Sequence, residues 1–279
     1  MQNYLDLLSD IIHNGTVKED RTGIGTRSVF GRTLRFDLSE GFPLVTTRNI
    51  SFRIAFEEIM FFLRGESNTK KLEEKNIFIW KDNTTREFLD SRGLFNVQEG
   101  FMGRGYGVQW RNYRGADNQS VDQIARLLHG LKSDPDSRRH LVTAWNPVEL
   151  DEMALPPCHI MHQYQVMNGK LNSSFYMRST DTYLGLPYNI AGYAFLNILF
   201  SKCLGLEPGE LVYMGGDVHL YENQIENAKL QIQRMPYSLP TLTFNRTPTV
   251  NNLYTMQYED VHLQGYKHYP PLPKVKMAV

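Results

Sequence analysis

The sequence predicts an α+β fold built as a single domain over residues 1–279. Segments with helical spacing of apolar residues are interspersed with segments that alternate like strands, without the regular strand–helix order of a parallel α/β sheet. Glycine and proline are scattered, and no repeat, low-complexity tract or linker divides the chain. A domain of this length can bury roughly three quarters of its unfolded surface, so its core needs no disulfide or metal.

Two helices are expected in the N-terminal part of the chain. Apolar residues recur at helical spacing over residues 4–12, and Gly15 is a suitable end for that helix. Ser51 can cap a second helix, which runs to Leu63 and is ended by Gly65.

Three segments predict strands. Residues 27–38 alternate like paired β-structure. The segments "CHIMHQYQV" (158–166) and "KLNSSFYMRS" (170–179) meet at "MNGK", where Asn-Gly favours a tight hairpin turn.

Two further helices are expected in the C-terminal half. Residues 189–205 are apolar nearly all round, which is typical of a buried central helix, whereas residues 221–234 are amphipathic and suit the surface. Residues 81–104 and 236–260 predict loops or irregular strands.

Charge and cysteine content exclude several classes of protein. Lysine plus arginine equals aspartate plus glutamate at 30 each, which argues against bulk binding to nucleic acid or an anionic membrane. No run of about 18 apolar residues predicts a membrane span, and the N-terminus does not resemble a signal peptide. The two cysteines, Cys158 and Cys203, are far apart, so we expect free thiols and a cytoplasmic location.

Cys158 is a candidate nucleophile, because two prolines fix the chain that enters it. Core packing is the competing explanation, and it suits Cys203 in its apolar helix well. If a strand begins here, Cys158 and His159 point to opposite faces, so His159 is not a simple base for the thiol. Zinc binding through Cys158, His159 and His162 is poorly spaced and lacks a fourth ligand, so no metal is predicted.

Glu58 is a candidate general acid or base. A carboxyl group in apolar surroundings has a raised pKa, which suits proton transfer near neutral pH. Adjacent Glu57 faces Arg53 and has a simpler, partly solvated explanation, while for Glu58 the competing explanation is a helix-end glutamate that reaches solvent. The helical neighbours of Glu58 are all apolar: Ile54, Ala55, Phe61 and Phe62.

An arginine set could bind a phosphate group. Arg138 and Arg139 are adjacent after a turn, Arg178 and Ser179 end a predicted strand, and Arg21 lies beside glycines. Guanidinium groups together with a hydroxyl suit a phosphate dianion. For each arginine alone, a solvated surface position is the better explanation.

Four polar residues stand in apolar company. The amide of Asn189 could read the edge of a base such as uracil, or Asn189 could cap the helix that follows. Asp181, His219 and Tyr221 are similarly placed, although a lone histidine is usually a satisfied core residue. From residue chemistry alone, these features indicate an enzyme-like domain with a reactive cysteine and a phosphorylated ligand.

Taken together, the motifs resemble those of folate-dependent thymidylate synthases, within the thymidylate synthase and pyrimidine hydroxymethylase superfamily. The resemblance covers almost the whole chain and implies a mixed, twisted sheet packed by helices, with one sheet face forming a homodimer interface. It implies reductive methylation of dUMP to dTMP, with 5,10-methylenetetrahydrofolate giving the carbon and hydride and leaving dihydrofolate. The matching segments are "DRTGIGT", "GFPLVTT", "FEEIMFFLRGESN", "IFIW", "YGVQWR", "DPDSRRHLVTAWNP", "MALPPCH", "RSTDTYLGLPYNIAGY" and "GDVHLY".

The resemblance also implies roles for individual residues. Cys158 would add to C6 of uracil, Arg178 would favour its thiolate, and Arg138 and Arg139 would come from the neighbouring subunit. The implied catalytic residues are Cys158, Glu58, Tyr106, His159, Arg178, Asp181 and Asn189. The implied nucleotide-binding residues are Arg21, Arg138, Arg139, Arg178, Ser179, Asp181, Asn189, His219 and Tyr221. The implied folate-binding residues are Ile79, Trp80, Leu155, Asp181, Leu184, Gly185, Tyr188 and Ala278, the last in a tail that would close over the folate.

Seven positions depart from the family pattern: Phe61 replaces a usual tryptophan, and Asn49 and Ser51 replace residues that are often basic near the folate tail. Asn83, Met177, Gly192 and Gln224 stand where the family often has tryptophan, glutamine, serine and histidine. One alternative is a hydroxymethylase that lets water capture the same intermediate, and another is a non-catalytic paralogue that binds nucleotide or RNA. Asn189 argues against dCMP as substrate, because the deoxycytidylate hydroxymethylases have aspartate there.

Overall fold

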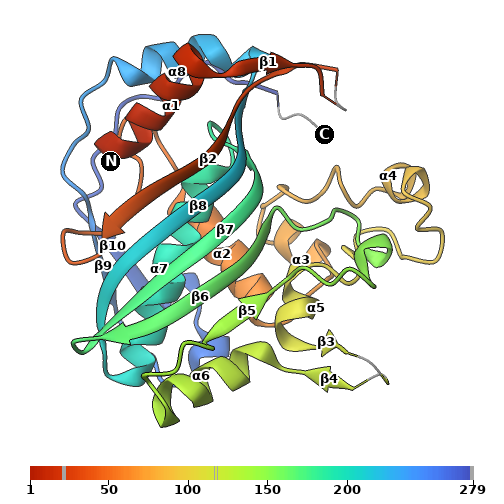
Figure 1. Ribbon diagram of the computed structural model, residues 1–279, viewed down its shortest axis with the longest axis vertical. Coiled ribbons are helices and arrows are strands. Elements are labelled where there is room, and N and C mark those ends of the chain that lie inside the picture. The colour runs from red at the N-terminus through yellow and green to blue at the C-terminus, as the bar shows by residue number, and fades with distance from the viewer. Residues whose placement is uncertain (21–22, 116, 118, 277–279) are drawn as a thin grey trace.

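The computed structural model describes residues 1–20, 23–115, 117 and 119–276, and a six-stranded sheet organises it (Figure 1). The strand order is β1-β2-β8-β7-β6-β5, and every neighbouring pair is antiparallel except β7 and β8, which run parallel. The sheet is therefore mixed, as expected. Its strands are β1 (Thr16–Lys18), β2 (Thr26–Asp37), β5 (Leu141–Thr143), β6 (His159–Met167), β7 (Lys170–Asp181) and β8 (Glu207–Tyr221).

Helix α7 (Leu186–Leu204) connects the two parallel strands and fills the centre of the molecule. Its residues are buried nearly all round, as their apolar sequence predicts. The helix begins at Leu186, with Gly185 as its N-cap, rather than after Asn189. Asn189 therefore lies in the first turn, and its interpretation as a helix cap is wrong.

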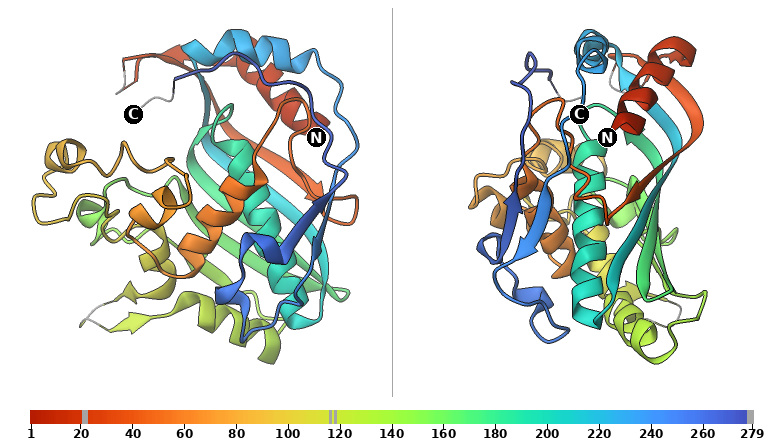
Figure 2. Two further views of the ribbon diagram at one scale, coloured as in Figure 1. Left: turned by 180° about the vertical axis from the view of Figure 1, so that it is seen from behind. Right: turned by 90° about the vertical axis from the view of Figure 1, so that its left-hand side faces the viewer.

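Figure 2 shows α7 against one face of the sheet, with α2 (Phe52–Leu63) on the far side of α7. The predicted N-terminal helix is confirmed as α1 (Gln2–Asn14), with Gly15 at its C-cap. Helix α2 ends at Leu63 as predicted, and Gly65 beyond it has a φ of 75°. Ser51 stands at the N-cap of α2, but its side chain makes no capping hydrogen bond, so that part of the prediction is wrong.

The predicted hairpin joins β6 to β7 at Asn168 and Gly169, whose φ values of 50° and 74° are those of a tight type I′ turn. The segments predicted as loops, 81–104 and 236–260, contain only short elements. The remaining elements are α3 (Lys70–Glu73), α4 (Arg86–Ser91), α5 (Tyr106–Arg111), β3 (Tyr113–Arg114), β4 (Ser120–Val121), α6 (Gln123–Ser133), α8 (Ile225–Ile232), β9 (Thr241–Phe244) and β10 (Val261–Gln264).

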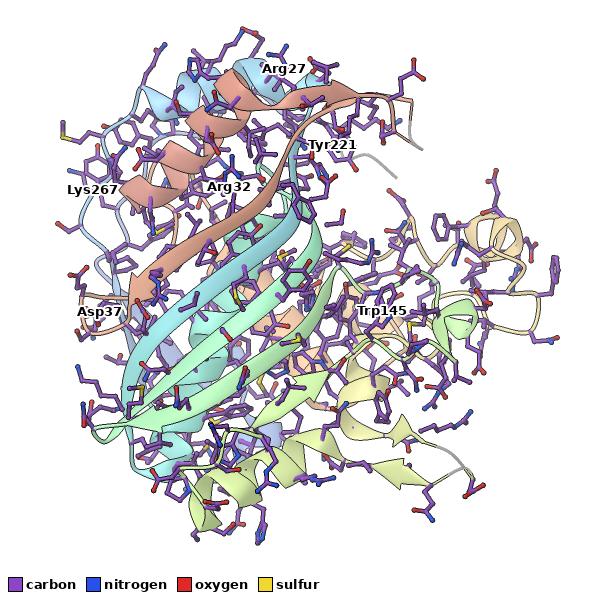
Figure 3. All side chains as sticks on the ribbon, in the orientation of Figure 1. Arg27, Arg32, Asp37, Trp145, Tyr221 and Lys267 are labelled. Carbon is purple, nitrogen blue, oxygen red and sulfur yellow. The ribbon has the colours of Figure 1, made fainter. Side chains whose placement is uncertain are left out.

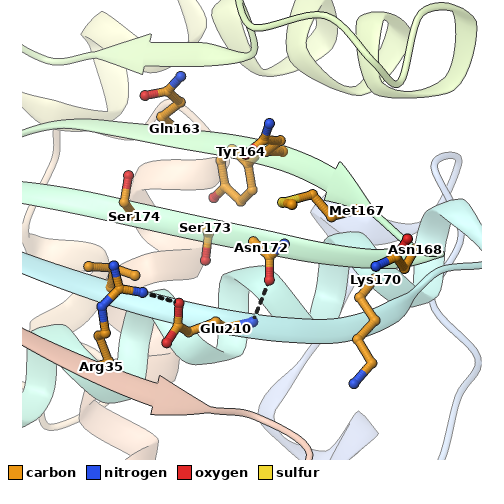
Figure 4. A pocket seen from close by; sticks show the side chains of 12 residues that line it. Arg35, Gln163, Tyr164, Met167, Asn168, Lys170, Asn172, Ser173, Ser174 and Glu210 are labelled. Atoms are coloured by element: carbon orange, nitrogen blue, oxygen red, sulfur yellow. Dashed lines mark hydrogen bonds and ion pairs between the residues drawn. The ribbon is translucent and has the colours of Figure 1, made fainter.

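The face of the sheet that is turned to the viewer in Figure 1 carries no helix across β6, β7 and β8 in the described part of the chain. A groove of about 640 Å³ lies on it (Figure 4), and Arg35 of β2 pairs there with Glu210 of β8. This open face lies opposite the helices and apart from Cys158. Other side chains that line the groove include Gln163, Asn172, Ser174 and Val212.

Two features are absent from residues 1–20, 23–115, 117 and 119–276. None of the helices is long and apolar enough to cross a membrane. No three histidine, cysteine, aspartate or glutamate side chains gather closely enough to hold a metal ion.

Candidate active site

Cys158 lies immediately before β6 and is fixed by its backbone from two directions. Its N–H donates a hydrogen bond to the Tyr106 hydroxyl of α5, with an N···O distance of 2.7 Å. Its carbonyl accepts from the backbone N–H of Arg178 on β7, at 2.9 Å. The pairing of β6 with β7 therefore sets the position of the thiol, which is half-buried.

Arg178 holds the two prolines that precede the thiol. Its Nε donates to the carbonyl of Pro157 at 2.8 Å, and its Nη2 donates to the carbonyl of Pro156 at 2.9 Å. Its guanidinium carbon lies 5.6 Å from the centre of the Trp145 ring, which Figure 3 labels. Because the two prolines lack N–H groups, each can form a backbone hydrogen bond to β7 only through its carbonyl.

Burial raises the pKa of the Cys158 thiol. The Arg178 charge and the hydrogen bond with Tyr106 act in the opposite direction but are smaller effects. Arg178 thus favours the thiolate, as expected, yet the thiol still ionises less readily than an exposed one. The thiolate, rather than the thiol, is the nucleophilic form of a cysteine.

His159 turns away from solvent and belongs to an aromatic cluster. Its Nδ1 lies 2.7 Å from the Tyr193 hydroxyl of α7, and its ring stacks on Tyr106 with 4.2 Å between centroids. Burial lowers its pKa to about 3, so the imidazole is neutral at physiological pH. His159 supports Tyr106, which in turn holds Cys158.

Glu58 lies on α2 and accepts a hydrogen bond from the Trp80 indole, with Nε1 and Oε1 2.9 Å apart. Burial raises the pKa of Glu58 to about 7, as its apolar helical neighbours predict. The expectation for Glu57 is wrong: it is buried and pairs with Lys75 at 2.6 Å rather than with Arg53. Lys75 follows α3, so the neighbours of Glu57 within its own helix could not reveal this pair.

Asp181 ends β7, and both of its carboxylate oxygens are engaged. Oδ1 accepts from the backbone N–H groups of Tyr183 at 3.1 Å and Leu184 at 2.8 Å, and Oδ2 accepts from Nε2 of Gln224 at 3.0 Å. Burial raises the pKa of Asp181, and these hydrogen bonds oppose that rise. Asp181 is paired with His219 of the adjacent β8, so the ends of the two strands meet here.

His219 and Tyr221 lie at the end of β8, and Figure 3 labels Tyr221 there. Nδ1 of His219 lies 2.9 Å from a carboxylate oxygen of Asp217, which also accepts from the Ser28 hydroxyl at 2.9 Å. Because a carboxylate only accepts, Nδ1 carries the proton and Nε2 of a neutral His219 can accept a hydrogen bond from a ligand. Ser179 of β7 faces Asp217 across the strand pair.

The arginines expected to bind phosphate do not come together within the described residues. Arg138 and Arg139 are exposed in the loop before β5, and neither guanidinium has an ion pair there. Arg178 lies beside Cys158 instead. Arg21 lies outside the described residues.

The seven expected folate-binding residues that the structure describes are all half-buried. Trp80 packs with its ring 5.7 Å from Tyr106, and Tyr188 and Leu184 are half-buried against the core. Gly185 permits close approach, because a Cβ there would lie 3.2 Å from the Asp181 carbonyl and 3.8 Å from Oδ1 of Asn189. Ile79 and Leu155 are half-buried, and Ala278 lies outside the described residues.

Gly192 replaces the usual serine because Ile59 occupies the space. A Cβ at residue 192 would lie 2.7 Å from Cγ1 of Ile59, closer than packed carbon atoms approach. Met177 is also buried, opposite His159 in the β6–β7 pair. Both departures are therefore accommodated within the packed interior.

Replacing Gly192 with serine is expected to destabilise the fold by about 1–3 kcal/mol, because the new Cβ overpacks α7 against α2. Thermal unfolding of Gly192→Ser and of Gly192→Ser/Ile59→Ala would measure this. The double variant should be less destabilised than the sum of the two single variants. Simple additivity would contradict a clash between residues 192 and 59.

Sequence reasoning missed three residues of the site: Tyr193, Asp217 and Gln224 as a partner of Asp181. Tyr193 and Asp217 lie inside the motifs "NIAGY" and "GDVHLY", which also contain the candidate residues Asn189 and His219. Their polar groups in apolar segments were a usable signal. The sequence gives no signal for the contact of Gln224 with Asp181, because Asp181 belongs to a strand that is distant in the sequence.

Comparisons with known proteins show which family the chain belongs to. The family model described as thymidylate synthase matches residues 2–279. A bifunctional dihydrofolate reductase-thymidylate synthase from Paramecium tetraurelia is 45% identical over 284 residues, which cover 99% of this chain and 61% of that protein. The chain thus spans about three fifths of the length of this curated relative.

Proposed function

Because the chain belongs to the thymidylate synthase family, we propose that it converts dUMP to dTMP with 5,10-methylenetetrahydrofolate as co-substrate. One observation carries the proposal for this chain. Contacts run unbroken from Cys158 through Tyr106 and Trp80 to Glu58, so one chain of contacts links a thiol to a carboxyl of raised pKa. A nucleophile and a proton-transfer group are what addition to a pyrimidine ring requires.

Cys158 is the proposed nucleophile. A bond from its sulfur to C6 of uracil converts C5 into an enolate-like carbon that can attack the carbon carried by the folate. The co-substrate supplies the one-carbon unit and then a hydride, leaving dihydrofolate. C5 must lose its own hydrogen as a proton before the thiol departs, so the protein has protons to move at C5 and at the thiol.

Glu58 is the proposed group for those proton transfers. A pKa of about 7 keeps both forms of the carboxyl populated at neutral pH, which suits a group that gives and takes protons in turn. Trp80 orients the carboxyl through its indole N–H. Tyr106 and His159 hold the cysteine loop beside it without titrating near neutrality.

Nucleotide binding is assigned to the ends of β7, β8 and α7. Asn189 can donate to and accept from the uracil edge, which favours uracil over cytosine. Nε2 of His219 and the Tyr221 side chain suit the 3′-hydroxyl of the deoxyribose. The phosphate is assigned to Arg178 and Ser179, together with Arg21, Arg138 and Arg139.

The folate is assigned to the space above the pyrimidine, with Asp181 at its centre. Asp181 is a half-buried acceptor, and Trp80, Leu184 and Tyr188 are half-buried against the core, which suits a flat ring that carries N–H donors. Ile79, Leu155 and Gly185 complete this set, and Ala278 is assigned to a closing tail that excludes water.

The proposed active unit is a homodimer that packs through the open face of the sheet. Leu141 of β5 lies opposite Gln163 of β6, so Arg138 and Arg139 lie beyond Gln163 on the side away from Cys158. About six residues of strand then separate them from Cys158, roughly 20 Å, which exceeds the reach of an arginine side chain. A second copy across the sheet face could bring the same arginines to the phosphate.

Mixing two inactive variants tests this shared site. Arg138→Ala lacks the borrowed arginine and Cys158→Ser lacks the nucleophile, but a hybrid dimer has one site with both. Random exchange should recover about a quarter of the wild-type activity, since half of the dimers are hybrids with one intact site. No recovery, with hybrids shown to form by mass, would contradict a shared site.

The nucleotide product distinguishes the proposed reaction from its alternatives. We expect mass spectrometry to find dTMP, with an equal amount of dihydrofolate by absorbance. Asn83, which is buried where the family often has tryptophan, favours a test for 5-hydroxymethyl-dUMP as well. That product without dihydrofolate would replace the proposal by a hydroxymethylase, and dUMP binding without any product would indicate a non-catalytic paralogue.

We assign the protein to the cytoplasm. The support is chemical, since a nucleophilic thiol and a second free cysteine, Cys203, suit a reducing compartment.

A further inference from the structure

Gln224 is a fully buried polar side chain that the reaction as described does not use. It lies in the short turn between β8 and α8, and its two ends bind two different parts of the site. Nε2 donates to Oδ2 of Asp181 at 3.0 Å, and Oε1 accepts from the backbone N–H of Tyr221 at 3.1 Å. The partners fix which end is which, because a carboxylate only accepts and an N–H only donates.

We propose that Gln224 is a positioning residue that locks the folate-side carboxylate of Asp181 to the sugar-side segment of Tyr221. This inference rests on the proposed function, which assigns Asp181 to the folate and Tyr221 to the nucleotide. The amide joins the ends of β7 and β8, so the segment assigned to the folate and the segment assigned to the nucleotide cannot move independently. Its hydrogen bonds keep the same direction at every pH, because an amide does not ionise near neutrality.

The amide matters because Oδ2 of Asp181 has no second donor among the hydrogen bonds of the described residues. Oδ1 is held by Tyr183 and Leu184 of its own turn, whereas Oδ2 is held by Gln224 alone. Loss of that donor would leave one oxygen of a half-buried carboxylate unpaired, which is costly. The carboxylate would then rotate or take up a proton, and either change alters what it presents to the folate.

The titratable groups around Asp181 come from four parts of the chain. They are His219 of β8, Cys158 before β6, Tyr4 of α1 and Tyr183 of the adjoining turn. The residue at position 224 adds no titratable group to this set. A histidine there would add one, and it would also have to donate to Asp181 and accept from the Tyr221 N–H at once.

Three variants separate positioning from simple support of the fold. Gln224→Met keeps the length but removes both hydrogen bonds, and we expect kcat/KM to fall roughly tenfold to a hundredfold, as for one lost bond to a charged group. Most of the fall should appear in the KM for the folate, with dUMP affinity also reduced. Gln224→His should recover most of the activity at alkaline pH and add an ionisation on the acid side of the pH profile. Gln224→Glu should lose activity as pH rises, since two carboxylates would face each other.

The readouts are steady-state kinetics over pH and calorimetric binding of dUMP to the same variants. An unchanged kcat/KM in Gln224→Met, or a Gln224→His pH profile that superimposes on the wild type, would overturn the inference. A lowered melting temperature with unaltered kinetics would do the same, because it indicates support of the fold alone. Failure of the proposed function is distinguishable, since the wild type itself would then form no dTMP.

Discussion

Cys158→Ser is expected to lose dTMP formation by on the order of 10⁴-fold to 10⁶-fold, the range seen when an enzyme loses its nucleophile. A serine hydroxyl ionises far less readily than a thiol, and this site makes ionisation harder still, because burial already raises the pKa of Cys158. Binding of dUMP should remain measurable, because the base, sugar and phosphate contacts are assigned to other residues. Turnover and calorimetric binding measured on one preparation would separate the two effects.

Cys203→Ser is the matched control for this change. Cys203 is the other free cysteine, it lies in the last turns of α7, and burial raises its pKa to about 12. The control should keep its activity, since no assigned contact involves Cys203. Substantial turnover in Cys158→Ser would remove Cys158 from the mechanism, whatever the control does.

Glu58→Gln is expected to lower kcat by about 10²-fold to 10⁴-fold, the usual contribution of a general acid or base. Glutamine keeps the shape and can still accept from Trp80, but it cannot take or give a proton. The wild-type pH profile should show an ionisation near pH 7 that the variant lacks, because burial raises the pKa of Glu58 to about 7. A variant profile that retains this ionisation would assign it to another group.

The raised pKa of Glu58 also makes the stability of the protein depend on pH. The direction is opposite to that expected for a carboxylate in an ion pair, whose pKa is lowered. Folding raises the pKa of Glu58 above its unfolded value of 4.5, so the folded state holds the proton more tightly. The contribution of Glu58 to the free energy of unfolding is complete below about pH 4.5 and is lost as pH rises through about 7. The free energy of unfolding of the wild type and of Glu58→Gln can be measured by denaturant titration over pH. The wild-type value minus the variant value should fall as pH rises over this interval.

Glu57→Gln is the matched control on the neighbouring position. It removes a carboxylate that pairs with Lys75, so it should destabilise the protein through a broken buried ion pair. It should leave the ionisation near pH 7 in place. A loss of that ionisation in Glu57→Gln would mean that the pH dependence does not report on Glu58.

Local chemistry made much of the fold predictable. The turn at Asn168 and Gly169 needs two positive φ values, which few residue pairs tolerate, so its sequence specified the hairpin. Helix α7 was equally clear, because a segment that is apolar on every side is stable only when surrounded. The sequence predicts the start of that helix at residue 189, after its true start at Leu186, because Gly185 gives no side-chain signal for an N-cap.

The site was predictable where a residue and its environment share one segment, as for Glu58 among its helical neighbours. It was not predictable where the partner comes from elsewhere in the chain. The partner of Glu57 is Lys75, and the guanidinium of Arg178 on β7 reaches the carbonyls of Pro156 and Pro157, which precede the neighbouring strand β6. The raised pKa of Cys158 could not be predicted for the same reason, because the degree of burial is a property of the whole fold.

In the proposed reaction, Cys158 adds to the pyrimidine and so activates C5. The most direct measurement uses dUMP that carries tritium at C5, with methylenetetrahydrofolate as co-substrate. For the wild type we expect one tritium released to water and one dihydrofolate formed for each dTMP, and for Cys158→Ser we expect neither. Formation of dTMP without tritium release, or release that survives in Cys158→Ser, would contradict the account.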